Sequence, residues 1–80
     1  GYYNRGNVSS ALKDYRSALE DYNKAIELDP EFAEAYFNRG LTQIFLGNNK
    51  QGILDLSKAG ELGVVSAYNI IKRFTDNTRE

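Results

Sequence analysis

The chain has 80 residues, which is enough for one small domain that buries about 60% of the surface its unfolded form exposes. Ten Lys and Arg against eleven Asp and Glu give a net charge of −1, which leaves no basic excess for binding nucleic-acid phosphates. There is no Cys and no His, so disulfides, thiolate nucleophiles, imidazole bases and zinc sites built from these ligands are excluded. The apolar runs fall far short of the roughly 20 residues that cross a bilayer.

We therefore expect a soluble protein with no cofactor and no bound metal, which binds neither nucleic acid nor a membrane. The absence of Cys is compatible with the cytoplasm and with the periplasm. The sequence does not decide between these compartments.

The spacing of apolar residues and the turn signals predict helices and no strand, at about residues 2–12, 15–28, 31–46, 50–61 and 66–74. Pro30 ends the second helix, because it lacks an N–H and disfavours helix in the residue before it. Glu31 and Glu34 are predicted in the first turn of the third helix, where carboxylates suit the positive end of the helix dipole. Gly47 is a helix C-cap signal. Residues 75–80 are predicted to form a polar tail.

The sequence repeats itself at an offset of 34 residues. This offset aligns YYNRG at residues 2–6 with YFNRG at residues 36–40. Further matches at the same offset are Leu12 with Leu46, Asp21 with Asp55, Lys24 with Lys58, Ala25 with Ala59, and, more weakly, Ala33 with Ala67 and Arg39 with Arg73. Chance rarely produces a five-residue block and a second block at one offset, so we infer a repeated structural unit.

A helix–turn–helix unit of this length that ends in Asp-Pro resembles the tetratricopeptide repeat (TPR) family. The family pattern places a large aromatic residue and then a Gly four residues later in the first helix of each pair, as in Tyr36 and Gly40. In the second helix the matching positions are Ala18, Tyr22, Ala25 and Pro30 in one pair, and Gly52, Leu56 and Ala59 in the other, where Val64 replaces the expected Pro. The departures are Ser9 and Gln43 where the family usually has an aromatic residue, and Arg5 and Arg39 where Leu is common.

The resemblance implies an all-α fold, an α–α superhelix in which five helices form two antiparallel pairs and a capping helix. It divides one domain at residues 1–74 into a first repeat at about 1–32, a second at about 33–65 and the capping helix at about 66–74. Gly1 falls inside the family pattern, so we also expect the chain to be a segment of a longer protein.

The residues that could carry chemistry do not form a catalytic site. The carboxylates are scattered over positions that we predict to be solvated helix faces, whereas a catalytic pair needs a shared and partly buried pocket. No glycine pattern for a phosphate-binding loop is present. We therefore expect no enzymatic activity.

The resemblance assigns the first helix of each pair to a concave face that binds peptides. The candidate groove residues are Tyr3, Asn4, Asn7, Ser10, Glu34, Phe37, Asn38, Leu41, Ile44 and Phe45. The last helix, through Ile70, Ile71 and Phe74, could instead bury the apolar part of this set. We expect the Phe45 side chain to be buried in this way, and Phe37 and Leu41 to remain exposed.

Asn side chains on this face can both donate to and accept from a peptide backbone, although Asn is also simply tolerated on an exposed helix. One subgroup of the family binds the C-terminal carboxylate of chaperone tails with Lys and Asn side chains. Asn7 and Asn38 match its Asn positions, whereas Tyr3 replaces an expected Lys and Tyr68 lies where basic residues are expected. Without these cations the charge-assisted bonds to a carboxylate are lost, so we do not expect this clamp.

The sequence thus predicts a non-enzymatic protein–protein interaction module that binds a peptide segment of a partner protein in the concave groove. The alternative is a scaffolding segment, which either self-associates weakly or stacks on further repeats of a longer parent protein. Saturable peptide binding by a monomer would favour the first interpretation, and a mass that depends on concentration would favour the second.

Overall fold

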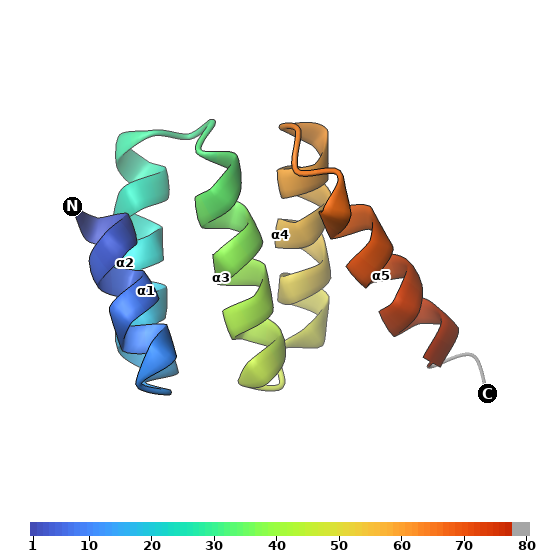
Figure 1. The fold of residues 1–80 in the computed structure, drawn as a ribbon, viewed down its shortest axis with the longest axis horizontal. Helices are drawn as coiled ribbons and strands as arrows, with labels where there is room; N and C mark the ends of the chain where they lie inside the picture. The colour runs from blue at the N-terminus through green and yellow to red at the C-terminus, as the bar shows by residue number, and fades with distance from the viewer. Residues whose placement is uncertain (78–80) are drawn as a thin grey trace.

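A computed structural model describes residues 1–77, and these residues form helices joined by short turns (Figure 1). In chain order the helices are α1 (Tyr2–Ala11), α2 (Tyr15–Leu28), α3 (Ala33–Phe45), α4 (Asn49–Glu61) and α5 (Ser66–Asn77). The described residues contain no strand, so the predicted all-α fold is confirmed. None of these helices is long and apolar enough to cross a membrane.

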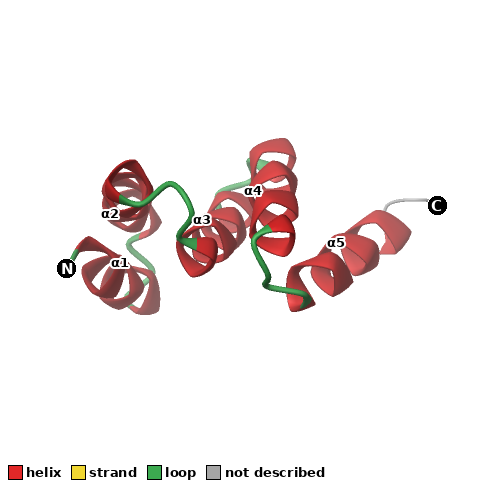
Figure 2. Ribbon diagram, turned by 90° about the horizontal axis from the view of Figure 1, so that it is seen from above, coloured by secondary structure: helices red, strands yellow, loops and turns green. Residues whose placement is uncertain are grey.

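Each helix packs against the next one along the chain, which gives an elongated stack of 40 × 25 × 16 Å. Figure 2 shows that α2 and α4 lie on one side of the stack, whereas α1 and α5 lie on the other. Helix α3 runs between α1 and α5 and also contacts α1. The face formed by α1, α3 and α5 therefore corresponds to the predicted concave side.

The helix ends follow local signals, with two differences from the prediction. Helix α3 begins at Ala33 and not at Glu31, because the Asp29 carboxylate accepts a hydrogen bond from the Glu31 N–H at 3.2 Å and holds Glu31 in the preceding turn. Helix α5 continues to Asn77, three residues beyond its predicted end, since neither Gly nor Pro follows Phe74. The rest of the predicted tail, residues 78–80, lies outside the described residues.

Small residues allow the paired helices to approach closely. A Cβ atom built on Gly52 of α4 would lie 2.7 Å from the backbone oxygen of Gly40 in α3 and 2.5 Å from Cγ1 of Ile44. In the first pair, a Cβ on Gly6 of α1 would lie 2.8 Å from the ring of Tyr22 in α2. The family positions predicted to be small are therefore the points where the helices of each pair cross.

In each helix pair, one Arg side chain of the first helix binds an Asp side chain of the second, at equivalent positions of the two repeats. Arg5 of α1 donates to both carboxylate oxygens of Asp21 in α2, at 3.0 and 2.8 Å. Arg39 of α3 donates in the same way to both oxygens of Asp55 in α4, at 2.8 Å each. These bidentate pairs are charge-assisted and directional, so they fix how the two helices of a pair are rotated against each other.

Candidate functional site

A hollow of about 320 Å³ lies between α1 and α3 on the predicted concave side. Its lining residues are Asn7, Ser10, Ala11, Tyr22, Asn38, Leu41, Thr42 and Phe45. None of these side chains is charged, although the chain as a whole is 26% charged. The hollow thus differs from the rest of the surface in combining amide and apolar groups without a net charge.

Hydrogen bonds join the polar side chains at the floor of this hollow. The Oδ1 atom of Asn7 accepts from the Tyr22 hydroxyl at 2.6 Å and from Nδ2 of Asn38 at 3.0 Å. The same Nδ2 atom donates to the Tyr3 hydroxyl at 3.0 Å. Burial, together with the neighbouring Tyr3, raises the pKa of Tyr22 above its ordinary value.

This network couples the orientations of the two Asn amides. Asn7 accepts through its oxygen and Asn38 donates through its nitrogen, so a flip of either amide would break bonds of the network. Among the described residues, Nδ2 of Asn7 has no acceptor and Oδ1 of Asn38 has no donor. This Asn pair therefore keeps one donor and one acceptor for a ligand.

An aromatic pair lies at the end of the hollow where α3 ends. Phe45 stacks on Tyr15, the first residue of α2, with ring centroids 5.2 Å apart and ring planes inclined by 21°. The Phe45 side chain nevertheless remains exposed, with 63% of its surface accessible. The expectation that Phe45 is buried is therefore wrong, because α5 diverges from α3 and α4 toward its own C-terminal end (Figure 1).

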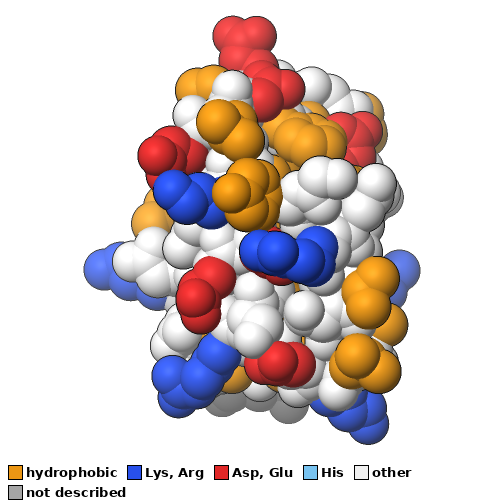
Figure 3. All heavy atoms as spheres, turned by 90° about the vertical axis from the view of Figure 1, so that its left-hand side faces the viewer, with side chains coloured by type: hydrophobic (Ala, Val, Ile, Leu, Met, Phe, Trp, Pro, Cys, Tyr) orange, Lys and Arg blue, Asp and Glu red, His pale blue; other side chains and the backbone are white. Residues whose placement is uncertain are grey.

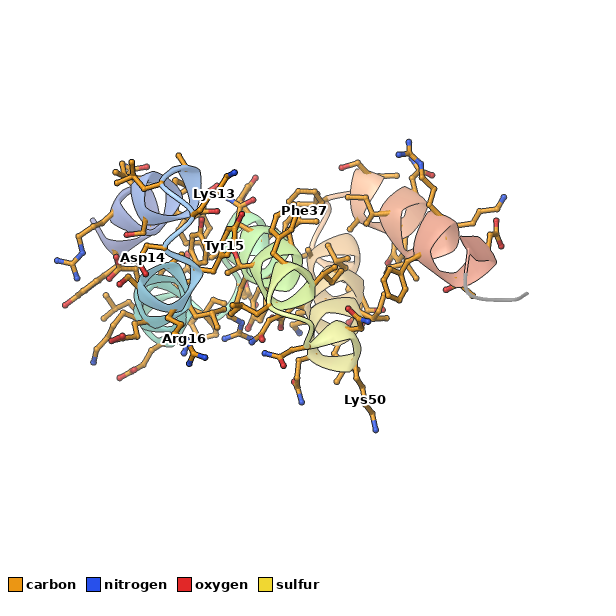
Figure 4. The ribbon with its side chains drawn as sticks, turned by 90° about the horizontal axis from the view of Figure 1, so that it is seen from below. Lys13, Asp14, Tyr15, Arg16, Phe37 and Lys50 are labelled. Carbon is orange, nitrogen blue, oxygen red and sulfur yellow. The ribbon has the colours of Figure 1, made fainter. Side chains whose placement is uncertain are left out.

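Most other apolar residues among the candidate groove residues pack toward the core. Phe37 and Leu41 are half-buried and pack, together with Ile70 and Ile71 of α5, against the core cluster of Leu56, Ala59 and Ala67. Phe37 and Leu41, for which we expected exposure, are therefore more buried than Phe45. Figure 4 shows Phe37 on the side of α3 that lies between α1 and α5.

Ile44 does not face the hollow. Its side chain is half-buried and lies over Gly52, because Gly52 has no Cβ that would occupy this space. Its position in the sequence, four residues after Gly40, places it on the flank of α3 that contacts α4.

The structure brings together half of the predicted site residues. Those that line the hollow are Asn7, Ser10, Asn38, Leu41 and Phe45. Tyr3 lies beside the hollow: its hydroxyl accepts from Asn38, and its ring packs on Phe32 with centroids 4.7 Å apart. Asn4 and Glu34 are exposed and lie outside the lining, as do Phe37 and Ile44.

Sequence reasoning did not find Tyr15, Tyr22 and Thr42 as parts of this site. Tyr22 was assigned to helix packing, and nothing in the pattern shows that its hydroxyl reaches Asn7. Thr42 is fully buried, and its hydroxyl donates to the backbone oxygen of Asn38 at 2.7 Å. Tyr15 and Phe45 lie 30 positions apart in the sequence, so their stacking depends on how α2 packs on α3.

The described residues contain no group of three or more His, Cys, Asp or Glu side chains that could hold a metal ion. The lining also contains no cation for a carboxylate, because the Lys and Arg side chains lie on other parts of the surface. The groups available to a ligand are therefore amide, hydroxyl, aliphatic and aromatic ones.

Comparisons with known proteins agree with this architecture. A family model described as TPR repeat matches residues 6–47, and a model described as Tetratricopeptide repeat matches residues 33–62. The protein STIP1 homolog of Dictyostelium discoideum is 39% identical over 61 residues, which cover 76% of this chain and 11% of that protein.

The UDP-N-acetylglucosamine–peptide N-acetylglucosaminyltransferase of Giardia intestinalis is also 39% identical over 61 residues, which cover 76% of this chain. This match covers 4% of the transferase. The chain thus spans about a tenth or less of the length of these two curated relatives.

Proposed function

Because the chain belongs to the tetratricopeptide repeat family, we propose that it binds an extended peptide segment of a partner protein in the hollow between α1 and α3. Its repeats make it a protein–protein interaction module, and repeats of this family are generally non-catalytic. The proposal concerns where and how this module holds its ligand.

The observation that carries the proposal is the pair of coupled amides. Nδ2 of Asn7 is a free donor and Oδ1 of Asn38 is a free acceptor, while their remaining bonds hold them in place. A peptide unit offers one C=O and one N–H, which is the complement of this pair. Groups that are already oriented lose little conformational freedom on binding, so each hydrogen bond contributes more of its energy to affinity.

The apolar end of the hollow supplies a second contact. Leu41 and the exposed ring of Phe45, which Tyr15 supports from behind, can cover an apolar side chain of the peptide. Burying one such side chain contributes on the order of 2 kcal/mol. We therefore expect a ligand that is uncharged where it contacts the hollow and carries an apolar residue next to the peptide unit held by the Asn pair.

The test is an amide NMR titration of the ¹⁵N-labelled chain with extended peptides that carry Leu, Phe or Asp at the central position. Saturable shifts at Asn7, Asn38 and Phe45 with the first two peptides and not with the third are expected. Each peptide is used with a free and with an amidated C-terminus. Binding that requires the free carboxylate would contradict the proposal, because it would mean that a terminal charge is recognised instead of a backbone unit.

Phe45→Ser is the variant that tests the apolar contact, and Leu54→Ser is its control. Both side chains are exposed, at 63% and 56%, but Leu54 lies on α4, outside the lining of the hollow. We expect Phe45→Ser to weaken peptide binding about tenfold or more, as the loss of about 1.4 kcal/mol of apolar contact requires. Equal affinities of the two variants would show that the peptide binds elsewhere.

Asn7→Asp tests the amide pair separately. The new carboxylate keeps an oxygen for the bonds from Tyr22 and Asn38 and removes the free donor of residue 7. We expect an unchanged fold and a weaker affinity for the amidated peptides. An unchanged affinity would refute the role of Asn7 in holding the peptide backbone.

A further inference from the structure

The turn between α1 and α2 holds a side chain in a backbone conformation that normally belongs to glycine. Lys13 has a φ of 65° and is the one residue other than Gly with a positive φ in the described part of the chain. Its N–H donates to the Ser10 oxygen at 2.9 Å, and the N–H of Asp14 donates to the Ser9 oxygen at 2.8 Å. These two bonds close the C-terminal end of α1 and require the left-handed conformation at Lys13.

The second repeat has a glycine at the same place. Gly47 stands one 34-residue period after Lys13, has a φ of 88°, and its turn makes the two equivalent hydrogen bonds. The two turns therefore share one backbone geometry, and only the first carries a side chain there. Because an L-residue is strained in this conformation, Lys13 makes the turn less stable than Gly would. A strained residue of this kind points to a role other than folding.

The Lys13 ammonium is not used within the fold. Its side chain is exposed and has no ion-pair partner among residues 1–77. The neighbouring Asp14 carboxylate is directed to α2 instead, where it accepts from the Ser17 N–H at 3.3 Å and caps the helix. The positive charge of Lys13 therefore remains available to a ligand.

Lys13 lies at the rim of the peptide hollow, at its apolar end. It stands two residues after Ala11, which lines the hollow, and two residues before Tyr15, whose ring supports Phe45. Its Cα atom is therefore at most about 7 Å from those of Ala11 and Tyr15. The flexible four-carbon stem of Lys lets the ammonium reach over this rim.

Two other cations at this end of the helices lie on the far side. Figure 4 shows Lys13 on the same side of the molecule as Phe37, whereas Arg16 and Lys50 lie on the opposite side, with α2 and α4. Arg16 lines a different hollow, between α2 and the turn that follows α3. Figure 3 shows the outer face of α1 and α2, with basic side chains at both edges of its lower end. Of these three cations, Lys13 is the one that a peptide in the hollow meets.

We propose that Lys13 binds the side-chain carboxylate of an Asp or Glu that stands beside the apolar residue of the peptide, on the side away from the Asn7–Asn38 pair. This inference rests on the proposed function and adds an acidic residue to its ligand. Along α3, Glu34 precedes Asn38 by four residues and is exposed, so it repels an acid at the other end of the hollow. Glu34 and Lys13 together therefore set which way the peptide lies.

The test compares acetylated and amidated peptides that carry a central Leu with two Glu, two Gln or two Lys on each side. We expect the Glu peptide to bind about threefold more tightly than the Gln peptide at low ionic strength, as one exposed ion pair provides, and the Lys peptide to bind more weakly. Added NaCl should reduce this difference. Equal binding of the Glu and Gln peptides would overturn the role of Lys13 and leave the groove in place. No saturable binding of any peptide would refute the groove, and this inference with it.

Lys13→Glu and Arg16→Glu are matched variants that change the net charge equally. We expect Lys13→Glu to reverse the preference from the Glu peptide to the Lys peptide, and Arg16→Glu to keep the preference of the parent chain. Equal effects of the two variants would overturn the proposal, because they would show a response to net charge alone.

Lys13→Gly separates ligand binding from folding. We expect the folding equilibrium constant in urea titrations to rise about threefold, because the strain is relieved, and the preference for the Glu peptide to disappear. The loss of preference then does not come from unfolding. A Gly variant that is less stable than the parent would overturn the proposal, because Lys13 would then be explained by its interaction with the α1 dipole.

Discussion

Replacing Gly52 by Ala tests how closely α3 and α4 must approach. The added Cβ would lie 2.7 Å from the Gly40 backbone oxygen and 2.5 Å from Cγ1 of Ile44, so one helix has to shift. Overpacking of this kind costs about 3 kcal/mol when the backbone itself is the obstacle. Ala gains about 1 kcal/mol over Gly in a helix, which leaves a net loss of about 2 kcal/mol in the free energy of unfolding.

Gly60→Ala, on the same helix, separates the effect of the crossing point from helix propensity. A Cβ there would meet the Tyr68 ring at 2.5 Å, but this ring is 47% exposed and can turn into solvent. We therefore expect a change within about 0.5 kcal/mol. Urea unfolding followed by far-UV circular dichroism measures both variants. Equal stabilities of the Gly52 and Gly60 variants would refute the argument that the backbones of α3 and α4 are in contact.

Three further predictions concern the polar contacts. Arg39→Met should lower the free energy of unfolding by about 2–4 kcal/mol in urea titrations, because it leaves the buried Asp55 carboxylate unpaired and also breaks the hydrogen bond to Asn23. A loss no larger than that for Arg5→Met would contradict this, because Arg5 is the more exposed guanidinium and bonds only the equally buried Asp21 among the described residues. Arg5 holds the pKa of Asp21 below its ordinary value, so the stabilisation is complete above about pH 4 and is lost as the pH falls through the lowered pKa. Urea midpoints measured from pH 6 down to pH 2 should thus fall less for Asp21→Asn, and equal slopes would exclude this ion pair as the cause. Tyr22→Phe should cost about 1 kcal/mol in urea unfolding, because it removes one of the two hydrogen bonds to Asn7, and an unchanged midpoint would show that this bond contributes nothing.

The fold could be predicted because small residues occur at fixed positions of the repeat, where the paired helices cross. Gly40 and Gly52 recur at family positions where helices cross, and the structure shows backbone contact there. Helix boundaries depended on weaker, local signals. The Asp29 carboxylate that holds Glu31 in a turn and the absence of a stop signal after Phe74 each moved a boundary by two or three residues.

The site was less predictable, because periodicity gives the direction of a side chain and not the position of the neighbouring helix. Phe45 follows Leu41 by four residues and shares its stripe, yet it is exposed because α5 diverges from α3 before reaching it. The Asn7–Asn38 bond joins residues 31 positions apart, so it depends on how α1 lies against α3. The 34-residue offset does hold one signal that sequence reasoning left unused, since it aligns Arg5 with Arg39 and Asp21 with Asp55.

These Arg–Asp pairs explain how the helices pack although Ser9 and Gln43 replace the usual aromatic residues. A guanidinium at the position where Leu is common forms two parallel hydrogen bonds to a carboxylate on the partner helix, which gives direction as well as energy. In Arg39 the third nitrogen reaches Asn23, so one side chain joins α3 both to its partner helix and to the preceding pair. Lys has no planar fork and could not make these bonds together. The same chemistry therefore holds the two helices of a pair together and sets how one pair lies on the next.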